Sequence, residues 1–137
     1  MHHPPNLLLV DDEATLRAAL ACRLRGHFHI THASSAAAAM QTLEESRIDI
    51  VCTDIDMPGT MDGLDLAEII SRRWPQIAVL INSGRDISQR RIPPRSAFFA
   101  KAAGLGKLVT ALFRLANVSL APSGSGRCLE DRHSIAR

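Results

Sequence analysis

Short apolar segments alternate with amphipathic ones along most of this chain, and that alternation limits the folds it can adopt. Segments read as strands cover residues 7–10, 28–33, 48–53, 77–81 and 97–100. Segments with apolar residues at helical spacing cover residues 13–25, 36–46, 64–73 and 105–115. Continuous apolar runs are typical of strands buried on both faces. Strands that alternate with helices form a parallel sheet with right-handed crossovers. We therefore predict an α/β fold with a doubly wound, five-stranded parallel sheet.

One connection is expected to be irregular. Pro93 and Pro94 lie between the fourth and fifth predicted strands. Proline is not accepted in a helix interior, and the residue before it is restricted as well. The sequence predicts no regular helix over residues 92–96 and at most a short one within residues 85–91, so the fourth helix of the fold is shortened.

The 137 residues are enough for one domain. We predict a frayed N-terminus over residues 1–6 and a folded domain over residues 7–116. Residues 117–137 lose the apolar periodicity and gain serine, glycine and charge, which predicts a mobile tail. No second domain is expected in so short a remainder.

Composition excludes several classes of function. The formal charge of +2 and the 4% content of aromatic residues do not favour direct nucleic-acid binding. The apolar run Leu7–Val10 is too short to cross a membrane, and acidic residues follow it where a signal peptide would be apolar. Three widely spaced cysteines do not form a disulfide framework or a zinc motif. A cytoplasmic protein is expected.

Polar residues follow four of the predicted strands at the points where the strands end. In an open parallel sheet, ligands bind outside the carboxyl ends of the strands. Aspartate taken singly is common in helix caps and turns. Polar residues at four strand ends indicate a site instead. Its candidate residues are Asp11 and Asp12, Asp54 and Asp56, Ser83, and Lys101.

The chemistry of these side chains favours phosphoryl transfer. Crowded carboxylates repel one another, so they share a proton or bind a cation. Oxygen ligands without histidine or cysteine favour Mg²⁺. A divalent cation and an ammonium group around one carboxylate suit that carboxylate as a nucleophile toward phosphorus.

Four sequence segments carry a resemblance to a known family. LLLVDDE, IVCTDIDMPGTMDGLDLA, VLINSG and FFAK, in this order and spacing, resemble the receiver domain of bacterial two-component response regulators. The resemblance covers residues 7 to 116. It implies a flavodoxin-like sheet with strand order 2-1-3-4-5. It also implies that the protein accepts a phosphoryl group and switches an output surface.

The resemblance assigns a phosphoacceptor and a metal site. It implies that Asp54 accepts the phosphoryl group. Asp12 would bind Mg²⁺ directly and Asp11 mainly through water. Asp54 and the backbone carbonyl of Asp56 would complete the protein ligands of the ion.

The resemblance also assigns a switch and a class of partner. Lys101 would pair with the phosphoryl group and Ser83 would hydrogen-bond one of its oxygens. Phe98 would turn inward when Ser83 moves. The phosphoryl group would come from a histidine kinase or a phosphotransfer protein. The output partner is not specified, and a homodimer is possible.

The sequence departs from the family pattern after the lysine. Ala102 stands where the family commonly has proline, and only an X–Pro bond makes the cis form inexpensive. We therefore predict a trans Lys101–Ala102 bond. We expect Lys101 to be held less rigidly than in typical receivers, with an ammonium group that still reaches the carboxylates.

Two other functions fit part of the pattern. Asp54 and Asp56 after an apolar strand are similar to the nucleophile motif of haloacid-dehalogenase phosphatases, but the acidic pair expected after the lysine is missing. Turnover of a small phosphate ester would distinguish that enzyme class from a receiver. A pseudo-receiver that binds partners without phosphorylation is the second alternative. Nucleotide binding is not expected, since no glycine-rich loop follows the first strand.

Overall fold

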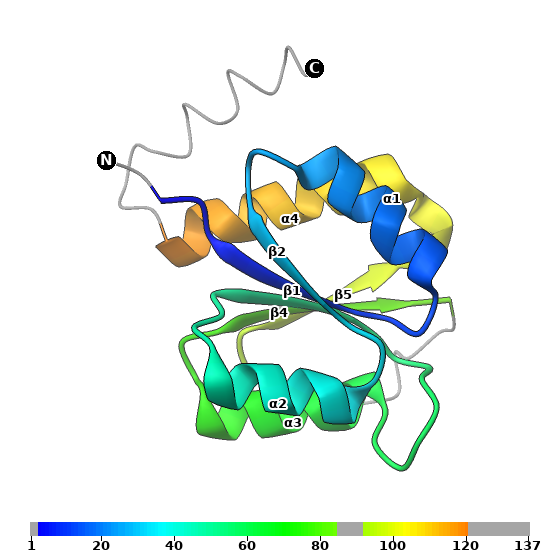
Figure 1. The fold of residues 1–137 in the computed structure, drawn as a ribbon, viewed down its shortest axis with the longest axis vertical. Coiled ribbons are helices and arrows are strands. Elements are labelled where there is room, and N and C mark those ends of the chain that lie inside the picture. Colours follow the sequence, from blue (N-terminus) through cyan, green and yellow to red (C-terminus); the bar gives the residue numbers. More distant parts are fainter. Residues whose placement is uncertain (1–2, 85–91, 121–137) are drawn as a thin grey trace.

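The computed structural model describes residues 3–84 and 92–120, with side chains through Asn117. Five parallel strands form one sheet in the order β2-β1-β3-β4-β5. This order confirms the predicted doubly wound, flavodoxin-like sheet (Figure 1). The strands are β1 (Asn6–Val10), β2 (His29–Ala33), β3 (Ile50–Asp54), β4 (Ala78–Ser83) and β5 (Ser96–Ala100).

Helices cover both faces of the sheet. The helices α1 and α4 lie on one face, and α2 and α3 lie on the other (Figure 1). A short 3-10 helix, η1, connects β5 to α4. The bounds are α1 (Ala14–Leu24), α2 (Ala36–Glu45), α3 (Gly63–Arg73), η1 (Lys101–Ala103) and α4 (Leu105–Leu120). None of the helices in the described part of the chain is long and apolar enough to span a membrane.

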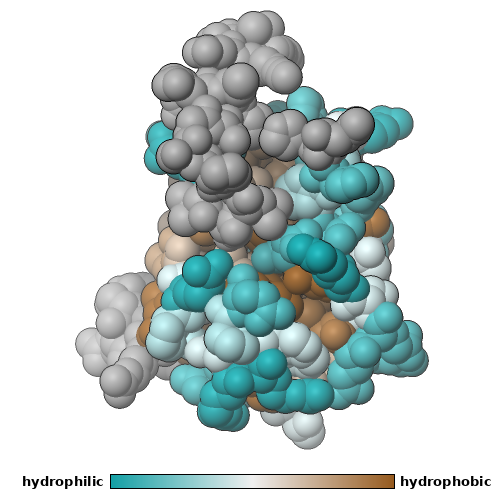
Figure 2. All heavy atoms as spheres, turned by 90° about the vertical axis from the view of Figure 1, so that its left-hand side faces the viewer, coloured by the Kyte–Doolittle hydropathy of each residue, from teal (hydrophilic) through white to brown (hydrophobic). Residues whose placement is uncertain are grey.

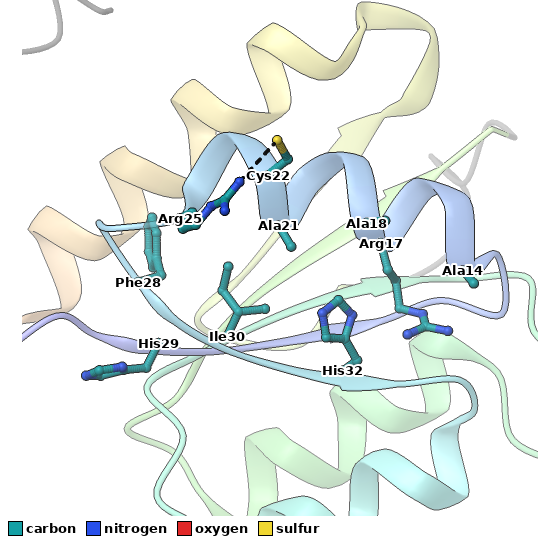
Figure 3. Close-up of a pocket in the computed structure, with 10 residues that line it drawn as sticks. All are labelled: Ala14, Arg17, Ala18, Ala21, Cys22, Arg25, Phe28, His29, Ile30 and His32. Carbon is teal, nitrogen blue, oxygen red and sulfur yellow. Dashed lines mark hydrogen bonds between the residues drawn. The ribbon is translucent and has the colours of Figure 1, made fainter.

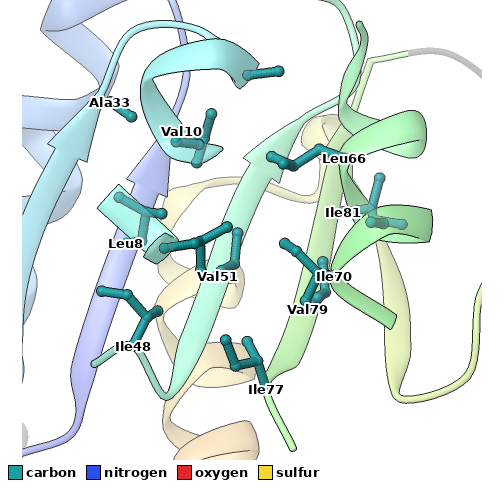
Figure 4. Close-up of a cluster of buried hydrophobic side chains, with 14 of the residues drawn as sticks. Leu8, Val10, Ala33, Ile48, Val51, Leu66, Ile70, Ile77, Val79 and Ile81 are labelled. Atoms are coloured by element: carbon teal, nitrogen blue, oxygen red, sulfur yellow. The ribbon is translucent and has the colours of Figure 1, made fainter. Parts of the chain in front are cut away.

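The central strands are buried on both faces, which explains why they read as continuous apolar runs. Alternate residues of a strand contribute to opposite faces. Val51 packs in the cluster beneath α2 and α3 (Figure 4), and its neighbour Cys52 packs in the cluster beneath α1 and α4. On the face shown in Figure 2, hydrophilic residues predominate and hydrophobic atoms are visible in smaller areas between them. The helices thus enclose two apolar layers, one on each side of the sheet.

Local sequence signals set where two helices begin. The Ser35 hydroxyl oxygen accepts a hydrogen bond of 3.1 Å from the Ala38 N–H at the start of α2. At the start of α3, Asp62 and Asp65 form a capping box in which each carboxylate accepts the other residue's backbone N–H, at 2.8 and 3.0 Å. These caps satisfy N–H groups that have no partner within the helix.

Secondary structure extends beyond both ends of the predicted domain, residues 7–116. The strand β1 begins at Asn6, whose backbone N–H donates to the Asp49 carboxylate at 2.8 Å, so Asn6 does not belong to a frayed end. Helix α4 continues to Leu120, and the predicted tail start at residue 117 is therefore wrong. No glycine or proline interrupts the chain between Leu105 and Leu120 except Gly106, so nothing forces an earlier end. The rest of the predicted tail, 121–137, lies outside the described residues.

The residues that lead into β5 form no helix, as predicted for residues 92–96. The Ser96 N–H donates to the Pro93 carbonyl at 3.2 Å and closes a turn. Arg95 within this turn has φ 63°, a left-handed conformation that is uncommon for residues other than glycine. The prediction of a short helix within residues 85–91 falls outside the described residues.

Candidate functional site

The ends of β1 and β3 bring three carboxylates together. The two strands are neighbours in the sheet, with Val10 in register with Thr53, so the residues that follow meet at one edge. Carboxylate oxygens of Asp11, Asp12 and Asp54 lie within 4.8 Å of one another. Asp11 and Asp54 are only 6% and 5% exposed, whereas Asp12 is exposed to solvent. The predicted convergence of these three aspartates is therefore present.

An ammonium group reaches this cluster from β5. The Nζ of Lys101 lies 3.3 Å from Oδ1 of Asp54. Lys101 is the first residue of η1, directly after β5, and its side chain extends past β4, the strand between β3 and β5. The structure has no cis peptide bond in its described part, so the Lys101–Ala102 bond is trans, as predicted. The long lysine stem makes this contact without the proline of the family pattern.

The acidic cluster is electrostatically unfavourable in the absence of a cation. Burial raises the pKa of Asp54, and neither the Lys101 ammonium nor the Asp56 backbone N–H cancels that effect. Burial also raises the pKa of Asp11, and the charge of Asp54 adds to it. A hydrogen bond of 2.9 Å from the Glu13 N–H to Oδ1 of Asp11 opposes this rise. Three carboxylates face one ammonium group, so the cluster retains excess negative charge.

Burial and charge act in opposite directions on Lys101. Burial lowers the pKa of its ammonium group, but the nearby Asp54 and Asp11 carboxylates outweigh it and the pKa is raised. Lys101 is therefore charged at neutral pH. The chain has two lysines: Lys101 lies at this edge of the sheet, and Lys107 lies on α4.

The donor set fits a hard divalent cation. The clustered ligand atoms are all carboxylate oxygens, which Mg²⁺ prefers. Asp54 Oδ1 is buried and accepts no well-directed hydrogen bond from the described residues; its contact with Lys101 is an ion pair. Such an oxygen keeps a lone pair available for a cation or a phosphoryl group.

Residues that the sequence analysis did not single out hold the backbone of the cluster. The hydroxyl of Thr53 donates to the carbonyl of Asp54 at 2.9 Å. The Nε of Arg17 donates to the carbonyl of Asp11, also at 2.9 Å. Gly63 packs so closely against the backbone at Asp54 that a Cβ there would overlap the Asp54 carbonyl. The polar Thr53 within an apolar strand was a sequence signal for its hydrogen bond to Asp54. The contacts that Arg17 and Gly63 make depend on the tertiary fold.

The remaining predicted site residues lie around the same edge. Ser83 ends β4, is buried, and pairs in register with Ala100, the residue before Lys101. Asp56 is exposed in the loop after β3. Phe98 on β5 is 38% exposed. Among the described residues it is the one large hydrophobic residue that is exposed. The roles of these three residues stay predictions.

Comparison with known proteins identifies the family. The model of the response regulator receiver domain matches residues 7–94. The chain is 36% identical over 81 residues, 58% of its length, to an NtrX-like response regulator of Rickettsia conorii, and covers 17% of that protein. It is 32% identical over 79 residues, 57% of its length, to the receiver protein CpdR of Brucella abortus, and covers 65% of it.

A solved structure extends the likeness beyond the matched residues. A response regulator receiver protein of Sinorhizobium medicae superposes with a TM-score of 0.76 at 28% identity, over 86% of this chain and 98% of that one. The family match ends at residue 94, before β5, so the structure rather than the match brings Lys101 to the cluster. On the match over more than half of its length, this chain belongs to the response regulator receiver domain family, the phosphoacceptor domains of two-component signal transduction.

Proposed function

We propose that Asp54 is the phosphoacceptor of this domain and that Asp11, Asp12 and Asp54 hold Mg²⁺ beside it, with the backbone carbonyl of Asp56. The observation that carries the proposal is the contact between buried Asp54 and Lys101, at 3.3 Å, within a cluster of three carboxylates. A carboxylate placed among cations can attack phosphorus and form an acyl phosphate.

The transfer involves one bond formed and one broken. A carboxylate oxygen of Asp54 attacks the phosphorus of a phosphohistidine on a histidine kinase or phosphotransfer protein. The new O–P bond forms as the P–N bond breaks, and the histidine nitrogen keeps the electron pair and takes a proton from solvent. Lys101 pairs with the charge on the phosphoryl oxygens. A bound Mg²⁺ supplies further positive charge at those oxygens.

The same residues assist phosphorylation by small phosphodonors and later hydrolysis, so the domain contributes to its own chemistry without being a turnover enzyme. Ser83 donates a hydrogen bond to a phosphoryl oxygen, and Phe98 turns from its exposed position toward the space that Ser83 leaves. This rearrangement is a two-state switch of an output surface, biased by the new charge.

Acetyl phosphate tests the proposal most simply. The protein incubated with acetyl phosphate and Mg²⁺ should gain one phosphoryl group by intact mass, and chelation of Mg²⁺ should prevent the gain. No gain under either condition would support the pseudo-receiver. Continuous release of phosphate from a chromogenic phosphate ester, at a rate independent of phosphoprotein formation, would support a phosphatase.

Asp12→Ala should weaken Mg²⁺ binding more than Asp11→Ala. The exposed Asp12 is proposed as a direct ligand, whereas Oδ1 of Asp11 already accepts the Glu13 N–H and Asp11 acts mainly through water. Loss of an indirect partner typically costs about 10- to 100-fold in metal affinity, and loss of a direct ligand should cost more. Mg²⁺ titrations monitored by the melting temperature would measure both, because bound Mg²⁺ stabilises the fold. Equal losses would contradict the assignment.

Lys101→Met should slow phosphorylation of Asp54 by about 10- to 100-fold, because a charge-assisted contact at the reacting group is lost. Methionine keeps the length of the stem and removes the charge. Lys107→Met is the matched control, since Lys107 is exposed on α4 and is the chain's only other lysine. Unchanged rates for Lys101→Met would exclude a role for the ammonium group.

A further inference from the structure

A groove of about 640 Å³ lies between α1 and β2. Small side chains of α1, including Ala18 and Ala21, form one wall, and Ile30 of β2 forms the other (Figure 3). The helix wall is shallow because alanine occupies positions where a longer side chain would cover the strand. The groove is therefore an apolar surface that the fold leaves open along one margin of the sheet.

The groove runs beside an unpaired strand. The strand β2 is the last in the sheet and has no strand neighbour on its outer side in the described chain. The backbone groups of His29 and Ala33 face β1 and the residues that flank it. The His29 N–H donates to the Pro5 carbonyl at 2.9 Å, and the Ala33 carbonyl accepts from the Asp11 N–H at 3.0 Å. In a parallel ladder, alternate residues face opposite neighbours. The N–H and C=O groups of Ile30 and His32 consequently point toward the open side, where an added strand could pair with them.

Two permanent positive charges stand at the ends of the groove. Arg17 lies near His32 at one end, and Arg25 lies near Phe28 at the other (Figure 3). The pKa of His32 is lowered by burial and by the charge of Arg17, so the arginines carry the charge at neutral pH. No carboxylate lines the groove among the described residues, and α1 contains no acidic residue.

The spacing of the arginines matches an extended acidic segment. Arg25 directly follows the last residue of α1, eight positions after Arg17, so the helical rise places their backbones about 12 Å apart. In an extended chain, residues i and i+4 point to the same side and lie about 13 Å apart. Carboxylates at those positions would face the two arginines while apolar residues between them lie against the alanines.

We infer that the groove between α1 and β2 is a docking site for an acidic segment of a partner protein, which adds as a sixth strand to the edge of β2. Strand addition supplies backbone hydrogen bonds through Ile30 and His32, and the arginines select carboxylates at i and i+4. The groove does not include Asp54 or Lys101, although the Nε of Arg17 at its end also donates to the Asp11 carbonyl at 2.9 Å.

A short synthetic peptide tests this inference on the full chain. The probe has about eight residues of valine and threonine with glutamate at i and i+4. Its binding is measured by fluorescence anisotropy, and backbone amide shifts locate it by NMR. We expect shifts and slower amide exchange at Ile30 and His32. The same peptide with glutamine in place of both glutamates should bind about 4- to 25-fold more weakly, because two exposed ion pairs are lost.

Variants separate the groove from general charge attraction. Arg25→Gln should raise the Kd of the peptide about two- to fivefold. Arg23→Gln is the matched control, because Arg23 is exposed on the same helix but does not line the groove, and it should leave the Kd unchanged. Ala18→Glu should abolish binding, and Asp54→Asn should retain it. Equal effects of Arg23→Gln and Arg25→Gln, equal binding of the glutamine peptide, or binding only of a helical acidic peptide would overturn the inference.

Discussion

Asp54→Asn is expected to abolish phosphorylation by acetyl phosphate while the protein remains folded. Asparagine keeps the size of the side chain but offers no anionic oxygen to attack phosphorus. Because burial raises the pKa of Asp54, its charged form is disfavoured in the folded protein. The neutral variant should therefore be at least as stable as the parent without Mg²⁺, which unfolding measurements would show.

The matched control for this loss is Glu44→Gln. Glu44 is an exposed acid on α2 that pairs with Arg73 at 3.1 Å, away from the carboxylate cluster. This variant should gain one phosphoryl group at the rate of the parent. Labelling of Asp54→Asn to the same extent as Glu44→Gln would show that another residue accepts the group.

Gly63→Ala is expected to have the largest effect on stability. A Cβ at Gly63 would overlap the carbonyl of Asp54 and press on Cα of Ile55, and these are backbone atoms that cannot rotate away. The Gly63 N–H also donates to the Ile55 carbonyl at 2.9 Å, so α3 cannot withdraw without breaking that bond. We expect a loss of about 3 kcal/mol or more in the free energy of unfolding, measured by denaturant titration.

Gly106→Ala provides the control for this substitution. Gly106 lies in the first turn of α4, and the nearest atom a Cβ would meet is Nη1 of Arg23 at 4.0 Å. Alanine is favoured over glycine in helices, so this variant should be stabilised by about 0.5–1 kcal/mol. If Gly63→Ala were as stable as the parent, the close packing of α3 against the end of β3 would not be required.

The pattern of apolar runs predicted most of the fold because strands buried on both faces leave a strong signal. Apart from the end of α4, the bounds of the five strands and four helices lie within about two residues of the predicted ranges. The end of α4 at Leu120 was missed because loss of amphipathic periodicity does not by itself end a helix. The actual stop signals, glycine and proline, come later in the sequence.

The proximity of the strand-end carboxylates followed from topology. Carboxyl ends of parallel strands meet at one edge, so Asp11 and Asp54 could be placed together from the sequence. The close approach of Gly63 to Asp54 could not be predicted, since it depends on how α3 packs against β3. The trans bond after Lys101 was predicted from Ala102, but the 3.3 Å contact depends on the path of the lysine side chain.

Chemical trapping of the acyl phosphate tests the central claim most directly. The protein phosphorylated with acetyl phosphate and Mg²⁺ is reduced with borohydride, which converts an aspartyl phosphate to homoserine, and the modified residue is located by peptide mass spectrometry. The account predicts homoserine at position 54 and unmodified aspartate at positions 11, 12 and 56. Homoserine at any of those three positions, with Asp54 intact, would contradict it.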